Sequence, residues 1–532
     1  MSNVKLLDCT LRDGGFVNDW EFGHDDIVNI FERLVSSAMD VIEVGFIDDS
    51  REFDMNRTIM PDTASIDKIF EGLNPGKAMI VGMIDFGTCA LENISLCSES
   101  FLDGIRVIFK QKDIVEALAY CKEIKNKGYK LFVQPVSITG YSDEEMLELV
   151  NMVNELDPYA MSIVDTYGLL HKNHLKHYFN LIDQNLSPQI GMGYHSHNNF
   201  QLGYSNAIEL ITIETKRNIT IDGSVYGMGK GAGNSNIELL AMYMNDNYGT
   251  NYDISQILEL IDVSIMQWFL KFPWGYSLRY YLAALNDCHP KYVIYLTQKR
   301  TLSMKSINEI LGSIEEKKKL SFDQKHIDEL YMDYQQKEID DTKSLKGLAQ
   351  ILKDKPILIV GPGTSADKFS DKIQKYVEEN KPVIISINYN PTKVDADYIF
   401  LSNAKRYIRL VNRLNSHDCN VKVIATSNVT RVNGAFDYTI EYSSLLDMDC
   451  SIIDNSLVML LKVLMKIGVK EVNLAGFDGY TSNDTPNYLD MAMEYVFTNE
   501  QANDVNRYVI NFISENSNEL NVKFITPSLY FK

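Results

Sequence analysis

The sequence has few cysteines, no long apolar run and a shortage of positive charge. Its seven cysteines, at positions 9, 89, 97, 121, 288, 419 and 450, are scattered and form no C-x-x-C pair. This pattern argues against a disulfide framework or a zinc knuckle and favours a reducing cytoplasm. No stretch approaches the roughly 18 apolar residues of a transmembrane helix, and the N-terminus lacks the regions of a signal peptide. We therefore expect a cytoplasmic protein without a membrane span.

The charge balance is strongly acidic. The 532 residues include 72 Asp and Glu against 51 Lys and Arg, which gives a net charge of −21. Such a chain repels nucleic acid and anionic membranes overall, so neither is expected as a partner. Hydrophobic residues make up 45% and charged residues 23%, which is typical of globular proteins and excludes a largely disordered or collagen-like chain. Its length suits several domains.

Residues 1–250 alternate short apolar runs with amphipathic stretches that have helical periodicity. Eight strands alternating with helices over about 250 residues are typical of a (β/α)₈ TIM barrel. An open, doubly wound sheet is the alternative. The barrel is favoured because polar residues recur where several of these strands end, which is where a barrel places its active site. The eight expected strands are 4–11, 40–46, 78–85, 104–109, 130–137, 160–165, 189–197 and 219–227.

The rest of the chain divides in two. Residues 251–353 carry helical patterns without a strand series, and we interpret them as a helical extension and connector. Strand signals return in residues 354–532, with helices between them, which predicts a Rossmann-like α/β domain. The fold class is therefore α/β throughout. The expected strands of this last domain are 356–361, 382–387, 397–401, 421–425, 437–441 and 470–475.

Two polar segments end candidate strands of the first domain. His195-Ser-His197 places two imidazoles on one face of a strand. Arg12 and Asp13 end the first strand and precede a glycine pair, which permits a sharp turn. Because the two strands are separated by only one other in a closed barrel, their C-terminal side chains can meet. One carboxylate and two imidazoles suit a catalytic divalent cation. Mn²⁺ or Mg²⁺ is the first expectation, and Zn²⁺, Co²⁺ and Fe²⁺ are the alternatives.

The D-x-T-L-R-D-G opening, the later H-x-H and the glycine-rich segment 227–234 together resemble the DRE-TIM metallolyases. This superfamily includes 4-hydroxy-2-oxovalerate aldolase, HMG-CoA lyase and the isopropylmalate-type synthases. The resemblance covers roughly residues 4–290. It implies metal ligands at Asp13, His195 and His197, with Arg12 stabilising an enolate. The implied substrates are a 2-oxo acid such as pyruvate and an aldehyde.

The resemblance also implies roles for neighbouring residues. Glu43, a carboxylate inside an apolar strand, is expected to pair with Arg12. Asn234 ends the glycine-rich segment and is expected to support the metal site or to bind substrate. Asp165 and Thr166 end the sixth strand and are expected either to bind substrate or to cap the following helix.

The branch of the superfamily is indicated by two local patterns. Gly15-Phe16 follows R-D-G at the place where the Claisen-type synthases carry Glu-Gln. This difference disfavours a Claisen-type acyltransferase that uses acyl-CoA, which is kept as the alternative. Tyr276-Ser277 resembles the tyrosine of the aldolases, which reaches the active site, and this favours a metal-dependent aldolase. Phe16 replaces the general-base histidine of those aldolases, so the base is Tyr276, Asp19 or a hydroxide held by the metal. His289 is expected to cap the helix at 277–286.

The last domain carries a second glycine turn. Gly361, Gly363, Thr364 and Ser365 follow a strand and open a helix, where a βα unit binds the phosphate of a nucleotide. A tight turn with Ser365 as helix cap is the alternative. Together with the Gly-Phe-Asp-Gly segment at 476–479, the turn faintly resembles a sialyltransferase-like fold, which implies a nucleotide or nucleotide-sugar ligand. A glycosyltransferase-like protein with an inactive barrel is thus a third possibility. We expect a homo-oligomer.

Overall fold

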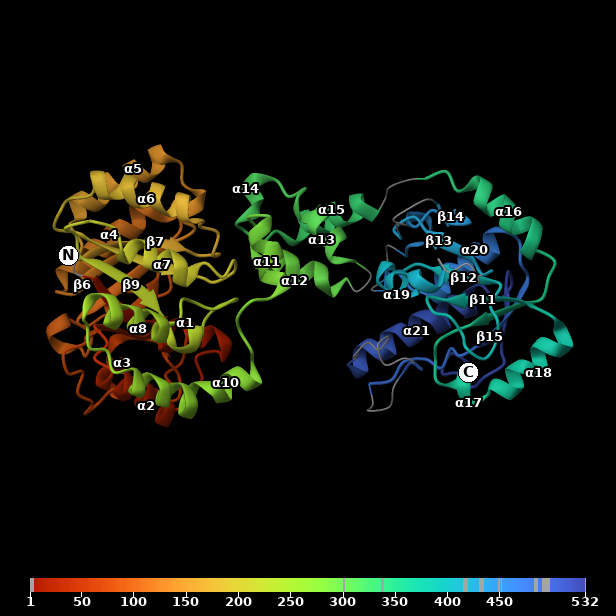
Figure 1. Cartoon of the computed structure of the whole chain (residues 1–532), viewed down its shortest axis with the longest axis horizontal. Coiled ribbons are helices and arrows are strands. Elements are labelled where there is room, and N and C mark those ends of the chain that lie inside the picture. Colours follow the sequence, from red (N-terminus) through yellow and green to blue (C-terminus); the bar gives the residue numbers. More distant parts are fainter. Residues whose placement is uncertain are drawn as a thin grey trace. The chain divides into compact units, whose positions relative to one another are not determined.

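The computed structural model describes residues 4–299, 302–335, 339–414, 420–429, 435–447, 450, 452–482, 487–489 and 498–531. It divides into two compact units (Figure 1). The first comprises residues 1–294 and 315–322, and the second comprises residues 295–314 and 323–532.

The first unit is built on a closed barrel of parallel strands. The sheet order is β1-β9-β8-β7-β6-β5-β4-β2, and β1 also pairs with β2, which closes the ring. A short strand, β3 (Ile59–Met60), pairs with the end of β2. The barrel strands are β1 (Val4–Asp8), β2 (Val41–Ile47), β4 (Met79–Asp85), β5 (Gly104–Phe109), β6 (Lys130–Pro135), β7 (Ala160–Asp165), β8 (Gly191–Ser196) and β9 (Ile219–Gly223). The sequence prediction of a TIM barrel is confirmed.

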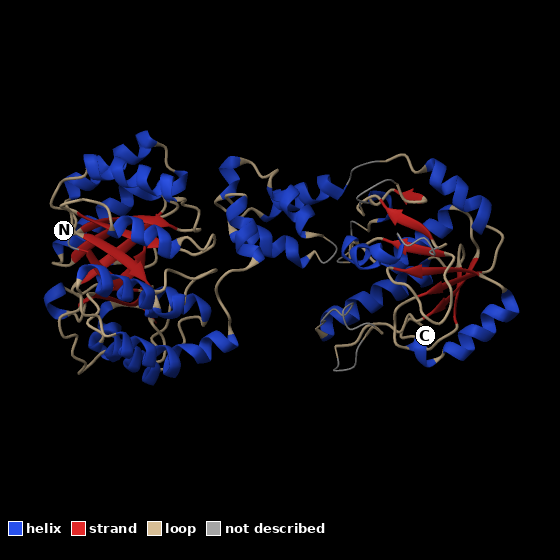
Figure 2. Ribbon diagram, viewed as in Figure 1, coloured by secondary structure: helices blue, strands red, loops and turns tan. Residues whose placement is uncertain are grey.

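Helices surround the strands of the barrel (Figure 2). They pack because each presents an apolar stripe, as α2 does with Ile27, Ile30, Phe31 and Leu34. The helices are α1 (Thr10–Asp13), α2 (His24–Ser36), α3 (Thr63–Ile69), α4 (Ile114–Asn126), α5 (Asp143–Leu156), α6 (Lys172–Asn185), α7 (Gly203–Ile211) and α8 (Ile237–Tyr248). Short 3₁₀ turns are η1 (Gly14–Val17), η2 (Leu91–Asn93), η3 (Cys97–Glu99), η4 (Gln111–Asp113), η5 (Ile138–Gly140) and η6 (Val225–Gly227).

The barrel interior changes character along its axis. Near the N-terminal ends of the strands it is apolar, with Leu7, Val41, Val81 and Phe132 in one buried cluster. Further toward the C-terminal ends, charged side chains replace these apolar ones and are fully enclosed. Since buried charges require partners, this polar layer marks the end of the barrel where a site is built.

The described part of residues 251–353 contains helices joined by loops and no strand, in agreement with the helical patterns in the sequence. The π-helical turn η7 (Ile261–Ile265) joins the first two helices. The helices are α9 (Ile254–Leu260), α10 (Met266–Lys271), α11 (Leu278–Leu285), α12 (Pro290–Gln298), α13 (Met304–Leu311), α14 (Glu316–Lys319), α15 (Gln324–Gln335) and α16 (Thr342–Leu352).

The second unit contains an open parallel sheet in the order β14-β13-β12-β11-β10-β15-β16. Ile357 and Ile359 of β10 pack into one apolar cluster, and Leu358 and Val360 pack into another on the opposite face. Helices therefore cover both faces, as in a doubly wound sheet. The strands are β10 (Ile357–Val360), β11 (Val383–Ile387), β12 (Tyr398–Leu401), β13 (Lys422–Thr426), β14 (Tyr438–Ile440), β15 (Glu471–Ala475) and β16 (Asn521–Phe524). The helices are α17 (Ser365–Lys368), α18 (Ser370–Asn380), α19 (Ala404–Leu414), η8 (Ser443–Leu445), α20 (Ser456–Lys466) and α21 (Asn499–Glu515).

Two strands escaped the sequence prediction. β3 has only two residues, and β16 alternates half-buried with exposed side chains at the edge of its sheet. Neither gives a strong apolar signal. The six cysteines in the described part are free, and Cys419 lies outside it. Among the helices described, none is both long and apolar enough to cross a membrane.

Candidate metal centre

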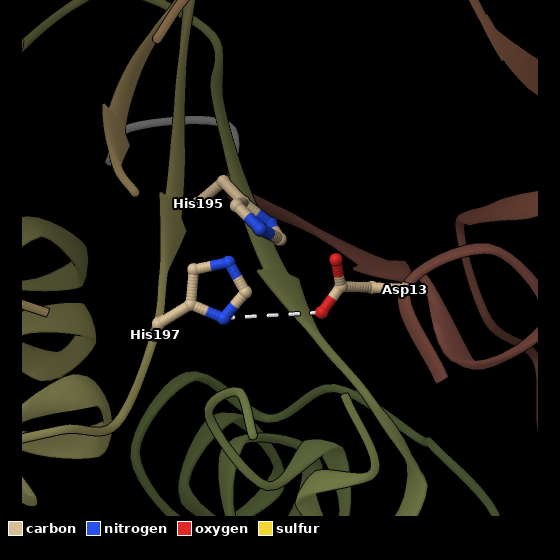
Figure 3. A group of neighbouring side chains, drawn as sticks. All are labelled: Asp13, His195 and His197. Atoms are coloured by element: carbon tan, nitrogen blue, oxygen red, sulfur yellow. Dashed lines mark ion pairs between the residues drawn. The ribbon is translucent and has the colours of Figure 1, made fainter. Parts of the chain in front are cut away.

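Three predicted ligands converge at the C-terminal end of the barrel. Asp13 lies on the turn after β1, while His195 on β8 and His197 just beyond it approach from across the mouth (Figure 3). One potential ligand atom from each lies within 4.8 Å of the others, and all three side chains are buried. Metal–ligand bonds of about 2.0–2.2 Å bring ligands of one ion slightly closer than this. The group is therefore close to the spacing of a three-ligand site with open positions.

Two of the three candidate ligands, His195 and Asp13, are oriented by neighbouring residues. Asp222 Oδ2 lies 3.0 Å from His195 Nδ1, which leaves Nε2 of that imidazole for a metal. Asn234 Nδ2 donates to Asp13 Oδ2 at 2.7 Å, and the backbone N–H of Lys230 donates to the same oxygen at 3.2 Å. The carboxylate and the first imidazole are thus held in place by the protein itself.

The protonation states suit a cation. Burial lowers the pKa of His197 to about 3, so its imidazole is neutral at physiological pH. Burial alone would raise the pKa of Asp13, but the positive charge of Arg12 and the nearby histidines hold it well below its ordinary value. His197 Nδ1 and Asn234 Oδ1 are buried without a hydrogen-bond partner among the described residues. These unsatisfied atoms beside an ionised carboxylate fit a divalent metal.

A buried chain of alternating charges connects the two sides of the site. Arg12 Nη1 donates to Asp13 at 2.6 Å, and Arg12 Nε donates to Glu43 at 2.6 Å, which is the predicted pair. Arg106 then bridges Glu43, at 3.0 Å, to Asp222, at 2.5 Å. Three carboxylates against two guanidinium groups leave one excess negative charge, which a bound cation would offset.

The glycine-rich segment brings backbone directly over Asp13. A Cβ added to Gly229 would lie 2.3 Å from Asn234 Nδ2 and 2.5 Å from Asp13 Oδ2. Gly233 has a φ of +77°, and a Cβ there would lie 2.1 Å from the carbonyl oxygen of Gly227. Only glycine permits this approach. The segment therefore serves to position Asn234 and the Lys230 amide on the carboxylate.

A large cavity opens in front of these residues. Its volume is about 1690 Å³, and it is lined by Arg12, Asp13, His195 and His197 at its inner end. Phe16, the residue in place of the aldolases' histidine, also lines it. The Lys230 ammonium lies 5.0 Å from the centre of the Phe16 ring, which places a proton-carrying group beside that position.

Several predicted site residues lie elsewhere. Tyr276 is 60% exposed and does not line the cavity, and Asp19 forms exposed ion pairs with Arg57 and Arg51. The structure thus brings neither of these two base candidates to the site.

The end of β7 is divided between the cavity and the protein interior. Thr166 lines the cavity, but its hydroxyl accepts a hydrogen bond from the Ser137 backbone. Asp165 accepts hydrogen bonds from the backbone N–H groups of Leu169 and Leu170 and caps the turn ahead of α6. Burial raises the pKa of Asp165 to about 7. This carboxyl is therefore satisfied by the backbone of the turn, but it does not cap α6, which begins at Lys172 after the N-cap residue His171.

His289 was expected to cap the helix at 277–286, and this is wrong. Its Nδ1 accepts a hydrogen bond from the backbone N–H of Lys291 at 3.1 Å, so it caps the first turn of α12 instead. Pro290 lacks a backbone N–H, so the next free amide is that of Lys291. The imidazole also lines the cavity.

The glycine turn of the second unit lies against an acidic side chain of the protein itself. Asp478 accepts hydrogen bonds from the Thr364 hydroxyl at 3.0 Å, the Ser365 backbone N–H at 2.9 Å and the Ser365 hydroxyl. Its carboxylate occupies the place that a phosphate would take at this helix start. The structure gives no support to the predicted nucleotide site here.

The two glycines of this turn serve packing. A Cβ on Gly361 would lie 2.5 Å from the Gly476 carbonyl oxygen, and one on Gly363 would lie 2.6 Å from the same atom. Gly363 N–H donates to that oxygen at 2.9 Å. The glycines thus allow the turn after β10 to lie against the loop after β15.

Sequence reasoning missed Arg106, Asp222 and Lys230. The first two are charged residues inside apolar strands, which is the same signal that singled out Glu43. Lys230 occupies a variable position of the glycine-rich segment, where the motif carries no information.

The chain thus has a parallel (β/α)₈ barrel whose C-terminal mouth, where such barrels place their active sites, carries a carboxylate and two imidazoles that could hold a metal ion. Residues 3–263 match the family model described as HMGL-like. This part of the chain is an HMGL-like domain, and its resemblance to the DRE-TIM superfamily is supported.

Three relatives carry three different names. 4-Hydroxy-2-oxovalerate aldolase 6 of Rhodococcus jostii is 21% identical over 51% of this chain and 76% of its own length. Oxaloacetate decarboxylase of Mycobacterium tuberculosis is 21% identical over 48% of this chain and 74% of its own. 2-Isopropylmalate synthase of Sulfolobus acidocaldarius is 23% identical over 47% of this chain and 64% of its own length. They support an enzyme without distinguishing its reaction, and they do not support the sialyltransferase-like resemblance.

Proposed function

We propose that the barrel is a divalent-metal-dependent aldolase that forms or cleaves a 4-hydroxy-2-oxo acid through a pyruvate-type enolate. The observation that carries this proposal is the convergence of Asp13, His195 and His197 beside Arg12 at the inner end of an open cavity. Mn²⁺ or Mg²⁺ bound by these three residues would supply Lewis-acid stabilisation of the enolate oxygen. Gly15-Phe16, in place of the Glu-Gln that the Claisen-type synthases carry, favours this reaction over the acyltransferase alternative.

Arg12 is the group that stabilises negative charge on the substrate. Its guanidinium is 4% exposed and lines the cavity, while Glu43 and Asp13 fix its orientation. A preorganised donor of this kind contributes about 3–4 kcal/mol to the stabilisation of a developing oxyanion. In the proposed reaction Arg12 contacts the 2-oxo acid, and Glu43 positions Arg12.

Lys230 is the proposed proton donor. It lines the cavity, and its ammonium lies over Phe16, within the volume that an incoming aldehyde enters. When the aldehyde carbonyl becomes an alkoxide, Lys230 gives that oxygen a proton and regains one from water. This assigns to Lys230 the proton-carrying role that the sequence prediction gave to Tyr276.

Exchange of the pyruvate methyl protons tests the enolate directly. The Mn²⁺- or Mg²⁺-loaded protein in D₂O is expected to exchange these protons, followed by NMR, without any aldehyde. Arg12→Met should lower the exchange rate at least about 100-fold. Arg217→Met is the control, because it also removes a buried guanidinium but bonds Asp183 and backbone carbonyls away from the cavity.

The two variants separate the possible results. Similar losses in Arg12→Met and Arg217→Met would show that Arg12 acts only through the fold. No exchange by the loaded wild type, together with release of free thiol from acetyl-CoA in the presence of a 2-oxo acid, would replace the aldolase by the acyltransferase.

A further inference from the structure

The cavity of the barrel is larger than a simple aldol reaction requires. Pockets for drug-sized ligands have volumes of about 300–1,000 Å³, whereas this one has about 1690 Å³. Pyruvate at the inner end leaves most of this volume to the second substrate. The acceptor is therefore expected to extend from the metal centre toward the outer wall.

The outer wall is built in part by the helical extension. The segment 316–322 and the turn before α12 both line the cavity. His289 N–H donates to the Lys319 carbonyl oxygen at 2.8 Å, which joins these two parts, and the Tyr167 hydroxyl donates to the Leu320 carbonyl oxygen at 3.3 Å. The second bond connects the extension to the loop after β7. The extension thus forms a fixed wall of the cavity.

The charge of this wall is opposite to that of the protein. The chain carries a net charge of −21, yet cations outnumber anions along the outer part of the cavity. Six lysines line that part, namely Lys110, Lys112, Lys230, Lys291, Lys317 and Lys319, against the four carboxylates Asp85, Asp143, Asp287 and Glu316.

Two of these lysines come to the cavity from different elements. Lys291 comes from the extension and Lys110 from the loop after β5, and neither side chain has an ion pair within the described part of the chain. The pKa of His289 is lowered to about 4, first by burial and then by the positive charges of Lys230 and Lys291. Both ammonium groups therefore lie near that imidazole. The positive charges of Lys110 and Lys230 both work to lower the pKa of Asp85, which burial raises. Positive charge is therefore in excess along the part of the cavity between the metal centre and the extension.

We propose that the acceptor is an aldehyde with an anionic group at the end away from its carbonyl, and that Lys291 and Lys110 bind this group. The inference rests on the proposed aldolase function. A phosphate and a carboxylate share the required chemistry, because both are anions that lysine binds as a point charge. The wall thereby selects the acceptor, while the inner residues bind the 2-oxo acid.

The reaction balances without any further reactant. The methyl carbon of pyruvate loses a proton to water and forms a bond to the aldehyde carbon. The electron pair of the aldehyde C=O moves to its oxygen, which takes a proton from Lys230, and water returns a proton to Lys230. Nothing is oxidised or reduced, and the product contains all atoms of both substrates, with the anionic group unchanged at its far end.

Paired acceptors test the inference. Pyruvate consumption is measured with glyceraldehyde 3-phosphate against glyceraldehyde, and with succinic semialdehyde against butyraldehyde. We expect kcat/KM to be at least about 100-fold higher for the anionic member of one or both pairs, since each contact to a charged group contributes a large factor. The pair with the larger ratio identifies phosphate or carboxylate.

Substitutions assign the effect to the wall. Lys291→Met and Lys110→Met should each raise the KM for the anionic aldehyde at least about 10-fold, equivalent to about 1.4 kcal/mol. They should leave the uncharged aldehyde and pyruvate exchange unchanged. Lys77→Met, which makes the same charge change before β4 at the opposite end of the barrel, is the control.

Three results would overturn the inference. Uncharged aldehydes could react as well as their anionic partners in the wild type, or the substitutions could affect both members of a pair equally. Either result, with pyruvate exchange intact, would contradict the proposal of an anionic acceptor and leave the proposed aldolase function standing. Absence of pyruvate exchange in the metal-loaded wild type would contradict both the anionic acceptor and the aldolase function.

Discussion

The two glycine turns of this chain look alike in sequence and do different things. Each follows a parallel strand, and each brings backbone too close to a neighbour for any side chain. The turn at 227–234 approaches Asp13 beside a cavity, and it leaves buried polar atoms without partners. The turn at 361–365 approaches Asp478, whose carboxylate accepts hydrogen bonds from the Thr364 hydroxyl and the Ser365 backbone N–H. A glycine turn indicates close approach, and only the atoms that it meets indicate a ligand.

The largest expected effect comes from the buried charges that support the first turn's site. Arg106→Met leaves Glu43 and Asp222 without their shared guanidinium. Since orphaned buried charges are costly, the free energy of unfolding of the barrel should fall by about 3–5 kcal/mol. Denaturant unfolding followed by fluorescence measures this.

The matched control for Arg106 is Arg57. It forms three ion pairs, with Asp19, Glu21 and Asp54, but all are solvent-exposed. Arg57→Met should change the free energy of unfolding by only about 0–1 kcal/mol. Equal losses in both variants would contradict the account of the buried charge chain.

A direct comparison of the two turns uses one substitution in each. Gly229→Ala would place a methyl group against Asp13 and Asn234, so aldolase activity should fall at least about 100-fold, since a misplacement of about 1 Å is this costly. Gly363→Ala would press on Gly476 and Asp478, so it should destabilise the second unit by about 1–3 kcal/mol. Barrel activity should be unchanged by the second substitution. Loss of barrel activity in Gly363→Ala would contradict the account that the second turn has no part in the activity of the barrel.

The pH dependence of stability provides a third test. In the unfolded chain Asp165 ionises near its ordinary pKa of 3.8, whereas in the folded barrel its pKa is about 7. Between these values unfolding releases a proton, so stability falls as the pH rises from about 4 to about 7, by a few kcal/mol at about 1.4 kcal/mol per pKa unit. Asp165→Asn stays neutral and should reduce this slope, and Asp8, whose pKa burial also raises to about 7, accounts for a remaining part. An unchanged slope would contradict the assignment to Asp165.

The smallest effect is expected at Tyr276. Its side chain is largely exposed and lies outside the cavity, with Tyr281 as a ring neighbour at 6.4 Å. Tyr276→Phe should keep activity within about twofold and stability within about 0.5 kcal/mol. A large fall in aldol turnover with metal binding intact would restore the tyrosine as proton carrier and exclude Lys230.

The barrel and the pairing of Arg12 with Glu43 could be predicted because both depend on local signals. Strand periodicity gives the order of the barrel, and a carboxylate in an apolar strand requires a partner. Arg106 and Asp222 carry the same signal, but the sequence does not say which charges meet across the barrel. Their partners depend on strand tilt and register, which only the closed sheet fixes.

The position of Tyr276 could not be read from the sequence for a different reason. It follows Gly275, whose φ of +112° redirects the chain, and a helical extension can leave the barrel in many directions. Likewise, the occupation of the second glycine turn by Asp478 depends on a loop more than 100 residues away. Long-range packing of this kind leaves no local pattern.

Divalent-metal binding tests the central claim most directly. Metal-depleted wild type is titrated with Mn²⁺ by calorimetry, and the account predicts one site per chain. His195→Ala with His197→Ala should weaken binding at least about 100-fold, since two of three ligands are lost. The control, His171→Ala with His174→Ala, removes two histidines that line the same cavity outside the ligand group and should bind like the wild type. Equal Mn²⁺ affinity in all three proteins would contradict the metal centre.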